Sequence, residues 1–446
     1  MSDHVFVGFG FGPIQAGLFA KEAFESGNFR RIVVAEIDQR LVDAVRANGG
    51  TYHVNVARSD RVETVQIGNV ELLNPSRDDE VRKALAEATE ITTCLPSVRF
   101  YDSDRSDTVA ALIAEGLKAR ESDATIVYAA ENNNHAAEIL EQAVARSWRG
   151  HPALALHNDS HAEGTQERDA LATQHDRRRA QFLNTVIGKM SQVVTDPAEI
   201  AERGLTPIAP GFDRAFLVEE FNRILVSKTT IPDFTPGIRV FIEKDDLLPF
   251  EEAKLYGHNA IHALLGFIGT LKGYTKMPEI QADESLMRVA REAFIRESGG
   301  ALIRKYASLG DALFTEAGFR DYAEDLLVRI TNPHLADSVA RASRDVVRKL
   351  GINDRIFGTM ALALEHGIEP NNMAMGAMAG VALLLANAAE YGLPRELESL
   401  DWRSLHAESL TQRLAWLWQA PLSPALHRLD DCTCAAAGPL IALLAA

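Results

Sequence analysis

A short strand that runs into glycines constrains the fold of this chain most. The β-branched and aromatic run Val5–Val7 is followed by Gly8, Gly10 and Gly12, and an amphipathic helix begins directly after them. Such a turn lets the backbone approach a pyrophosphate, and the helix N-terminus directs N–H groups at the anion. We therefore expect an N-terminal α/β domain of the Rossmann type that binds a dinucleotide. Pro13 stands where the third glycine of G-x-G-x-x-G is usual, so the turn alone is a weak indication.

A second buried strand is expected over residues 31–36, and it ends in Glu36. A carboxylate there accepts both ribose hydroxyls and repels a 2′-phosphate, which favours NAD over NADP. Asp38 is a nearby competitor, and Arg40 leaves NADP open. The alternative is an acid that caps a helix at a surface turn.

The same pattern continues as a doubly wound sheet. We expect strands at 90–95 and 124–130, helices at 41–46, 78–88 and 108–120, and a hairpin over 61–73 with its turn at Gly68-Asn69. Ligands bind beyond the carboxyl ends of parallel strands, so Thr93 and Asn132 are expected to line the cofactor cleft. An asparagine-rich turn formed for local reasons explains Asn132 equally well.

The second half of the chain is mostly helical. Strands are expected at 216–226 and 237–242, and helices at 251–271, 284–298, 313–329, 335–350, 358–366, 375–391 and 405–417. We therefore expect a dinucleotide-binding domain at 1–215 and a mostly α-helical catalytic domain at 216–446. The apolar tail 435–446 is too short to cross a bilayer, and a buried or interface helix is expected there.

Composition excludes several classes of protein. The 446 residues carry a net charge of −16, which opposes nonspecific nucleic-acid binding. Three cysteines and no signal-peptide pattern favour a cytoplasmic protein without a membrane partner. His157 and His161 are four apart, but no third ligand accompanies them, so no metal is expected. The sequence leaves the oligomeric state open between a monomer and a small homo-oligomer.

The stretch 250–266 carries the candidate chemistry. On an α-helix, Lys254, Asn259 and His262 fall within an arc of roughly 140°, together with His258. A lysine in a dry pocket accepts a proton near neutral pH. An asparagine donates to a developing oxyanion, and a histidine holds or relays a hydroxyl proton. The alternative is an ordinary amphipathic helix with a chance set of polar residues.

Two further stretches add candidates. Asn184 follows an apolar residue and could supply a second amide donor. An Asn-Pro step separates two helices and leaves Arg329, Asn332 and His334 near the junction. A cation there could reach a substrate oxygen or phosphate, although a salt bridge to a neighbouring acid explains Arg329 as well.

Together these phrases resemble the polyol-specific long-chain dehydrogenases. The resemblance rests on Lys-x4-Asn-x2-His at Lys254, Asn259 and His262, on R-x-x-N-P from Arg329 to Pro333, and on R-K-L-x-x-x-D-R from Arg348 to Arg355. It implies a Rossmann-type domain, a helical domain and a metal-independent active site between them. It also implies that Lys254 is the general base and that Asn259 and Asn184 form an oxyanion site.

The leading hypothesis is therefore an NAD-dependent oxidoreductase that acts on a sugar alcohol or its phosphate. Mannitol 1-phosphate with fructose 6-phosphate is the first choice. A free polyol or sugar acid (mannitol, arabinitol or altronate) and a noncatalytic NAD-sensing protein are the alternatives. A metal hydrolase using His258 and His262 is disfavoured, because Asn259 stands where the general-base glutamate of H-E-x-x-H would be.

Overall fold

The computed structural model describes residues 4–102, 107–120, 124–149, 180–392, 401–418 and 423–446. The chain divides into two compact units, 1–247 and 248–446. The division falls later in the chain than the expected boundary at 215/216, because the strands between 215 and 244 complete the sheets of the first unit.

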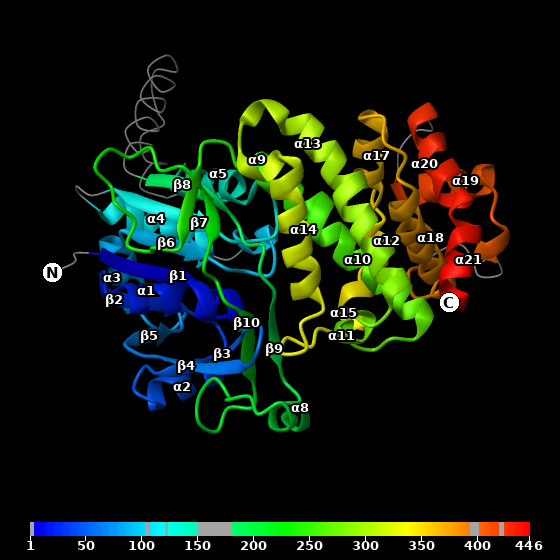
Figure 1. Ribbon diagram of the computed structural model, residues 1–446. Helices are drawn as coiled ribbons and strands as arrows, with labels where there is room; N and C mark the ends of the chain where they lie inside the picture. The colour runs from blue at the N-terminus through cyan, green and yellow to red at the C-terminus, as the bar shows by residue number, and fades with distance from the viewer. Residues whose placement is uncertain (1–3, 103–106, 121–123, 150–179, 393–400, 419–422) are drawn as a thin grey trace, which may run out of the picture. The chain divides into compact units, whose positions relative to one another are not determined.

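Unit 1 is built on an eight-stranded sheet (Figure 1). Its order is β12 (Phe241–Lys244), β11 (Ile224–Ser227), β8 (Ala180–Val186), β7 (Thr125–Ala129), β6 (Glu90–Thr93), β1 (His4–Phe9), β2 (Phe29–Ala35) and β5 (Val70–Leu73). The strands from β8 to β5 are all parallel, and β11 is antiparallel to β8. The strand order runs in opposite directions on the two sides of β1, so the switch point lies between β1 and β6.

Both faces of this sheet are covered. Alternate residues of β1 and β2 belong to two separate cores: Phe6 and Ile32 to one, Val7 and Val33 to the other. The helices of unit 1 are the π-helix η1 (Gln15–Phe19), α1 (Ala20–Ser26), α2 (Gln39–Ala47), α3 (Glu80–Glu87), the 3-10 helix η2 (Val98–Phe100), α4 (Val109–Ala119), α5 (Ala136–Arg149) and α8 (Pro197–Glu202). Burial on both sides explains why these strands read as continuous apolar runs. The α/β prediction is confirmed.

A second sheet corrects the expected hairpin. Its order is β4 (Val62–Ile67), β3 (Tyr52–Ala57), β10 (Ala215–Glu219) and β9 (Ser191–Val194). The prediction that 61–73 forms one hairpin is wrong, because β4 pairs with β3 while β5 pairs with β2. Asn69 does have a positive φ of 58°, so the turn exists, but it sends the two strands into different sheets. The single strand expected over 216–226 likewise divides into β10 and β11.

Unit 2 is helical. Its helices are α9 (Leu248–Glu252), η3 (Ala253–Asn259), α10 (Ala260–Lys272), α11 (Met277–Ile280), α12 (Glu284–Glu292), η4 (Ala293–Gly299), α13 (Gly300–Tyr306), η5 (Ala307–Leu309), η6 (Ala312–Phe314), α14 (Glu316–Ile330), α15 (Val339–Ser343), α16 (Val346–Lys349), α17 (Phe357–Glu365), α18 (Asn371–Ala386), η8 (Trp402–Ser404), α19 (Ala407–Trp418), α20 (Pro424–Ala435) and α21 (Ala437–Ala445). Of these, η3 and η4 are π-helices. The expected helix at 335–350 is two short helices, because Asp345 adopts a left-handed φ of 58° between them.

The helix α10 forms the centre of unit 2 (Figure 1). It packs closely on α15, where a Cβ built on Gly266 would lie 2.6 Å from the backbone of Ala342. On α18, Gly376 makes room for Leu264. The tail helix α21 is half-buried as expected, and its Leu443 carbonyl accepts a hydrogen bond from Lys272.

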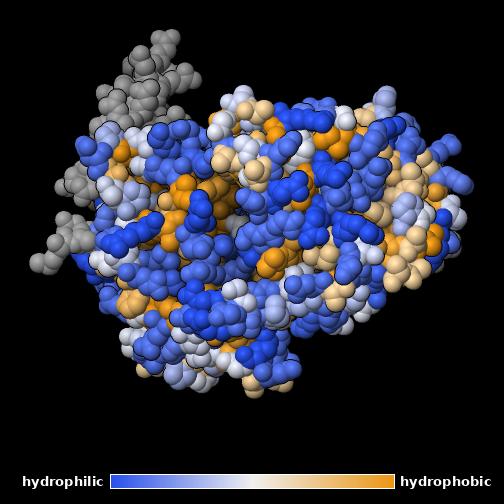
Figure 2. Space-filling model, viewed as in Figure 1, coloured by the Kyte–Doolittle hydropathy of each residue, from blue (hydrophilic) through white to orange (hydrophobic). Residues whose placement is uncertain are grey.

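The surface in view is dominated by hydrophilic residues, with apolar residues in scattered groups (Figure 2). Across the ranges described above, every helix falls short of the length and apolar character that a bilayer crossing requires.

Candidate functional site

The glycine turn lies at the switch point of the unit 1 sheet. Gly10 has a φ of +80°, and a Cβ there would lie 3.0 Å from the carbonyl oxygen of Cys94. Nothing lies within 4 Å of a Cβ built on Gly12, so this side of the turn is open to a ligand. The helix begins at Pro13, where the missing N–H costs no helical hydrogen bond. The departure at Pro13 is therefore compatible with the turn.

Glu36 connects the turn to the end of β2. Its two carboxylate oxygens accept hydrogen bonds from the backbone N–H of Phe11 at 2.7 Å and of Asp38 at 2.8 Å. Each oxygen has a further lone pair for a ribose hydroxyl. The capping role considered for this acid falls to Asp38, which caps α2 and pairs with Arg214 at 2.7 Å.

The carboxyl ends of β6 and β7 meet at a buried acid. Thr93 is fully buried and donates to Glu131 at 3.0 Å, and the Leu95 N–H donates to the same carboxylate at 2.8 Å. Tyr101 also donates to it, and burial raises the pKa of Glu131 to about 7. Thr93 therefore holds Glu131 in place, and Asn132, the next residue, is exposed at this edge. The sequence signal for Glu131 is an acid directly after a buried strand, and our prediction missed it.

Asn184 lies in β8, opposite Ala129 of β7. Its carbonyl oxygen accepts from the Ala137 N–H at 2.8 Å, and its amide donates to Glu138 at 2.9 Å. These bonds hold the start of α5. A carboxamide has two N–H donors, so its role as an oxyanion donor stays a prediction.

In unit 2, Lys254 and Asn259 lie on the π-helix η3 rather than on the expected α-helix. A π-helix is closed by i→i+5 hydrogen bonds and is wound with more residues per turn than an α-helix. On an α-helix the two residues would be about 140° apart. The π-helix therefore brings Lys254 and Asn259 closer to one face than an α-helix would.

Neighbouring elements support this turn. Thr359 is buried, and its hydroxyl lies 3.1 Å from the Tyr256 carbonyl oxygen and 2.5 Å from that of Arg355. A Cβ on Gly257 would lie 2.8 Å from the ring of Phe294 on η4. The turn is thus fixed by hydrogen bonds and packing from α17 and η4.

The electrostatics of Lys254 suit a base. Burial is the main cause that lowers the pKa of its amine to about 8; Glu251 opposes this shift, and the Arg355 guanidinium adds to it. Glu251 and Arg355 are themselves buried. At pH 7 roughly a tenth of Lys254 is therefore uncharged, and this fraction rises to half at about pH 8, where the amine can accept a proton.

His262 is positioned by an acid that our sequence analysis did not identify. Its Nε2 lies 2.9 Å from Oδ2 of Asp337, which also makes two hydrogen bonds to Arg341. Despite the cost of burial, the His262 and Arg341 partners hold the pKa of Asp337 well below its usual range. Ala336, just before it, has a positive φ of 48°. A strained residue at such a place is typical of a site that over-determines its geometry.

In the loop after α14, the candidate residues make contacts with their own neighbours in the chain. Arg329 pairs with Asp325 at 3.2 Å, which is the salt bridge considered as the alternative, and its charge also lowers the pKa of His258. The Asn332 side chain accepts from the His334 N–H at 2.8 Å and so shapes the turn.

Two further cations, which the sequence offers as candidates for a substrate phosphate, are buried in unit 2: the charge of Arg355 acts on Lys254, and that of Lys349 acts on His262. Lys349 is 3% exposed and donates to the Ala342 carbonyl at 2.7 Å. Burial, with Arg355, lowers the pKa of Lys349 to about 7. Arg355 also pairs with Asp354 at 2.7 Å.

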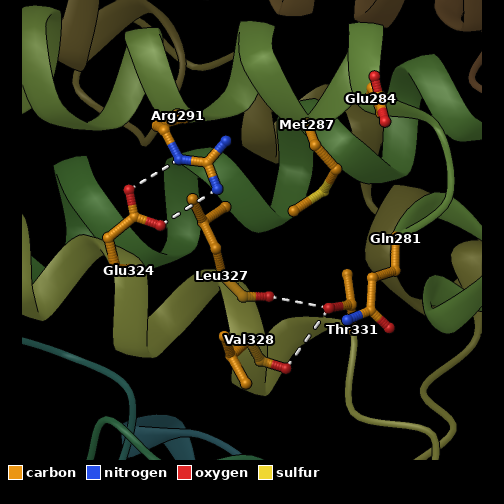
Figure 3. Close-up of a pocket in the computed structure, with 8 residues that line it drawn as sticks. All are labelled: Gln281, Glu284, Met287, Arg291, Glu324, Leu327, Val328 and Thr331. Atoms are coloured by element: carbon orange, nitrogen blue, oxygen red, sulfur yellow. Dashed lines mark hydrogen bonds and ion pairs between the residues drawn. The ribbon is translucent and has the colours of Figure 1, made fainter.

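A separate pocket of about 410 Å³ lies between α12 and α14 (Figure 3). None of the candidate site residues lines it. On its wall, Arg291 and Glu324 form a bidentate ion pair with hydrogen bonds of 2.7 and 3.1 Å. Within the described ranges, no group of three His, Cys, Asp or Glu side chains is arranged to hold a metal ion. His157 and His161 lie outside the described residues.

Comparison with known proteins agrees with this combination of fold and residues. Residues 246–413 match the family model "Mannitol dehydrogenase C-terminal domain". Over 401 residues the chain is 26% identical to mannitol-1-phosphate 5-dehydrogenase of Buchnera aphidicola subsp. Acyrthosiphon pisum (strain APS), with 89% of each chain covered.

Two solved structures share the fold. Pseudomonas fluorescens mannitol 2-dehydrogenase, in ternary complex with NAD and D-mannitol, is 17% identical with a TM-score of 0.68, over 100% of this chain and 94% of that one. A substrate-free D-sorbitol dehydrogenase is 16% identical with a TM-score of 0.69, over 96% and 95%.

Residues 246–413 therefore carry a mannitol dehydrogenase C-terminal domain, and the described chain has the fold of two polyol dehydrogenases, which are oxidoreductases. Over most of its length the chain is also similar in sequence to mannitol-1-phosphate 5-dehydrogenase. The resemblance inferred from the sequence is confirmed.

Proposed function

We propose that this protein transfers hydride between NAD(H) and a secondary alcohol of a polyol or polyol phosphate, with Lys254 as the general base and without a metal. The observation that carries the proposal is that Lys254 and Asn259 share one π-helix, together with the pKa of about 8 for Lys254. A metal-independent alcohol oxidation needs these two functions, a base for the hydroxyl proton and a donor for the oxygen that gains charge.

The residues of the glycine turn suit NAD. Gly10 and Gly12 leave the backbone accessible, and the helix that starts at Pro13 directs its N-terminus toward a pyrophosphate. Glu36 would bind the ribose hydroxyls, and the exposed Asn132 stands at the same edge of the sheet. When bound, NAD supplies the hydride acceptor.

The residues of unit 2 act on the alcohol. Uncharged Lys254 accepts the hydroxyl proton, and the Asn259 amide donates to the same oxygen as its charge grows. Asp337 accepts from His262 Nε2 when that nitrogen carries the proton, so the other ring nitrogen is an acceptor that can orient a hydroxyl. Asn184 is proposed as a second amide donor.

For the substrate, we propose mannitol 1-phosphate and fructose 6-phosphate. Lys349 and Arg355 are buried, and their charges act on His262 and Lys254, so a substrate phosphate bound here would have basic partners that a neutral polyol does not need. Mannitol-1-phosphate 5-dehydrogenase is among the relatives. A sugar acid such as altronate would also use these cations, whereas free mannitol or arabinitol would not.

The decisive experiment measures NADH oxidation with three separate substrates: fructose 6-phosphate, fructose, and the keto sugar acid that corresponds to altronate. We expect fructose 6-phosphate to have the highest kcat/KM, and Lys349→Met to raise its KM while leaving the weaker reaction with fructose unchanged. A preference for free fructose or for the keto acid would contradict the proposed substrate.

The base is tested separately. We expect Lys254→Ala to lower kcat by roughly 10²- to 10⁴-fold with little change in NADH affinity. NADH binding without turnover of any polyol or ketose in the wild-type protein would favour the noncatalytic NAD-sensing alternative.

A further inference from the structure

One histidine of the π-helix is not used by the chemistry proposed above. His258 directly precedes Asn259 and follows Lys254 by four residues. It is 6% exposed, and its Nδ1 is buried with no hydrogen-bond partner in the described parts of the chain. Its neighbour His262, in contrast, is held by Asp337.

The surroundings of His258 are those of the candidate site. Burial holds the pKa of its imidazole well below the ordinary value, and the charges of Arg329, Lys254 and Arg341 act in the same direction, as does His262. The imidazole is therefore neutral, and it has one donor and one acceptor to offer. A ring whose pKa is held low favours hydrogen bonding over proton transfer.

An unpaired ring nitrogen at this depth is unfavourable unless a ligand pairs with it. A hydroxyl both donates and accepts, so the hydroxyl groups of a polyol suit this nitrogen in either tautomer. A rotation of 180° about χ2 keeps the histidine ring in the same plane and exchanges its two edges. We infer that Nδ1 of His258 hydrogen-bonds a substrate hydroxyl other than the one that is oxidised, and so helps to select polyols by the hydroxyl at that position.

This inference rests on the proposed function and assigns His258 as a specificity residue of the same site. Since the ring takes no part in proton transfer, its removal should leave the pH dependence of kcat/KM unchanged. It should weaken the binding of substrates that carry the selected hydroxyl, and of those alone.

The test compares His258→Leu with His258→Asn. The leucine side chain has no polar atom, whereas the asparagine amide places a polar atom near the position of Nδ1. For the best ketose substrate, we expect His258→Leu to lower kcat/KM by roughly 5- to 100-fold, mainly through KM. His258→Asn should restore most of the loss. NADH affinity should not change.

Monodeoxy analogues of that substrate provide the specific readout. Wild-type protein should discriminate against the analogue that lacks the contacted hydroxyl, and His258→Leu should accept this analogue and the parent almost equally. A structural role would lower both reactions together and would lower the urea midpoint of unfolding. We expect no loss of stability, because an apolar side chain replaces an unpaired polar one.

The two hypotheses fail in different ways. If the wild-type protein reduces no ketose, the proposed function is wrong. If it reduces a ketose but His258→Leu keeps the full discrimination against every deoxy analogue, only the role of His258 is wrong. Should His258→Leu show no turnover at all, His258→Asn decides: restored discrimination supports the inference, and an inactive or undiscriminating variant overturns it.

Discussion

A partly buried lysine whose pKa is lowered should destabilise the folded protein, and replacing it should stabilise the fold while greatly reducing turnover. The pKa of Lys254 is lowered from 10.5 to about 8. At ~1.4 kcal/mol per pKa unit, this difference corresponds to about 3 kcal/mol. We therefore expect Lys254→Met, which keeps most of the aliphatic stem, to unfold with a free energy up to about 3 kcal/mol greater than that of wild type at pH 7.

The pH dependence fixes the sign of this effect. Because the folded pKa lies below the unfolded one, the unfolded chain binds more protons between pH 8 and 10.5. The penalty is complete below pH 8 and disappears as the pH rises through this window. The advantage of the variant should therefore shrink to about 1 kcal/mol at pH 10.

The assay is urea unfolding of the apo chain at pH 7 and pH 10, followed by far-UV circular dichroism, with NADH oxidation measured on the same samples. Lys272→Met, at the other end of α10, is the matched control. Lys272 pairs with Asp283 at 2.6 Å, so its loss should destabilise the protein and preserve turnover. A Lys254→Met variant that is less stable than wild type at pH 7, or whose advantage does not depend on pH, would refute the assignment of a desolvated amine.

Three further predictions concern the same site. The kcat/KM of alcohol oxidation should rise with pH to a plateau above about 8, and that of ketone reduction should fall above it, because the two directions need uncharged and charged Lys254; profiles in both directions check this. Asp337→Asn should release His262 and so lower kcat/KM roughly tenfold or more, which steady-state kinetics measure. It should also reduce stability at neutral pH, as urea unfolding would show. The reason is that a carboxylate whose folded pKa is depressed stabilises the fold above its unfolded pKa. Thr359→Val removes the hydroxyl beside the Tyr256 carbonyl and should cost about 1 kcal/mol of stability with a larger relative loss in kcat than in NADH affinity, which steady-state kinetics and NADH titration compare.

The fold was predictable where local sequence decides it. Val5–Val7 and the residues 32–35 are buried on both faces, so their apolar composition identifies them without any knowledge of partners. The strand pairs around Asn69 were not predictable, because β4 and β5 flank one tight turn, yet β4 hydrogen-bonds to β3 and β5 to β2. Which edge a strand joins depends on distant segments, and no periodicity in the strand itself records that choice.

The residues of the candidate site were likewise predictable only in part. Residue type and spacing indicated Lys254, Asn259 and His262, and the glycine turn indicated Glu36. Asp337 was missed because it acts on His262, 75 positions away in the sequence. Glu131 was missed although it directly follows a buried strand, because its partner Thr93 lies 38 positions earlier. Thr93, which we expected to face the cofactor, supports Glu131 from a fully buried position instead.

The spacing of the central motif is itself explained by the π-helix. A lysine and an asparagine five residues apart point about 140° away from each other on an α-helix, so the sequence alone predicts a broad polar face. The i→i+5 hydrogen bonds of a π-helix reduce this angular separation. Such a turn forms only where neighbouring helices fix it. Here Gly257 yields space to Phe294 and Thr359 lies within hydrogen-bond distance of Tyr256. The residues that make Lys254 and Asn259 act together thus include ones that never contact a substrate, so substitutions on α17 and η4 should alter turnover through the geometry of η3.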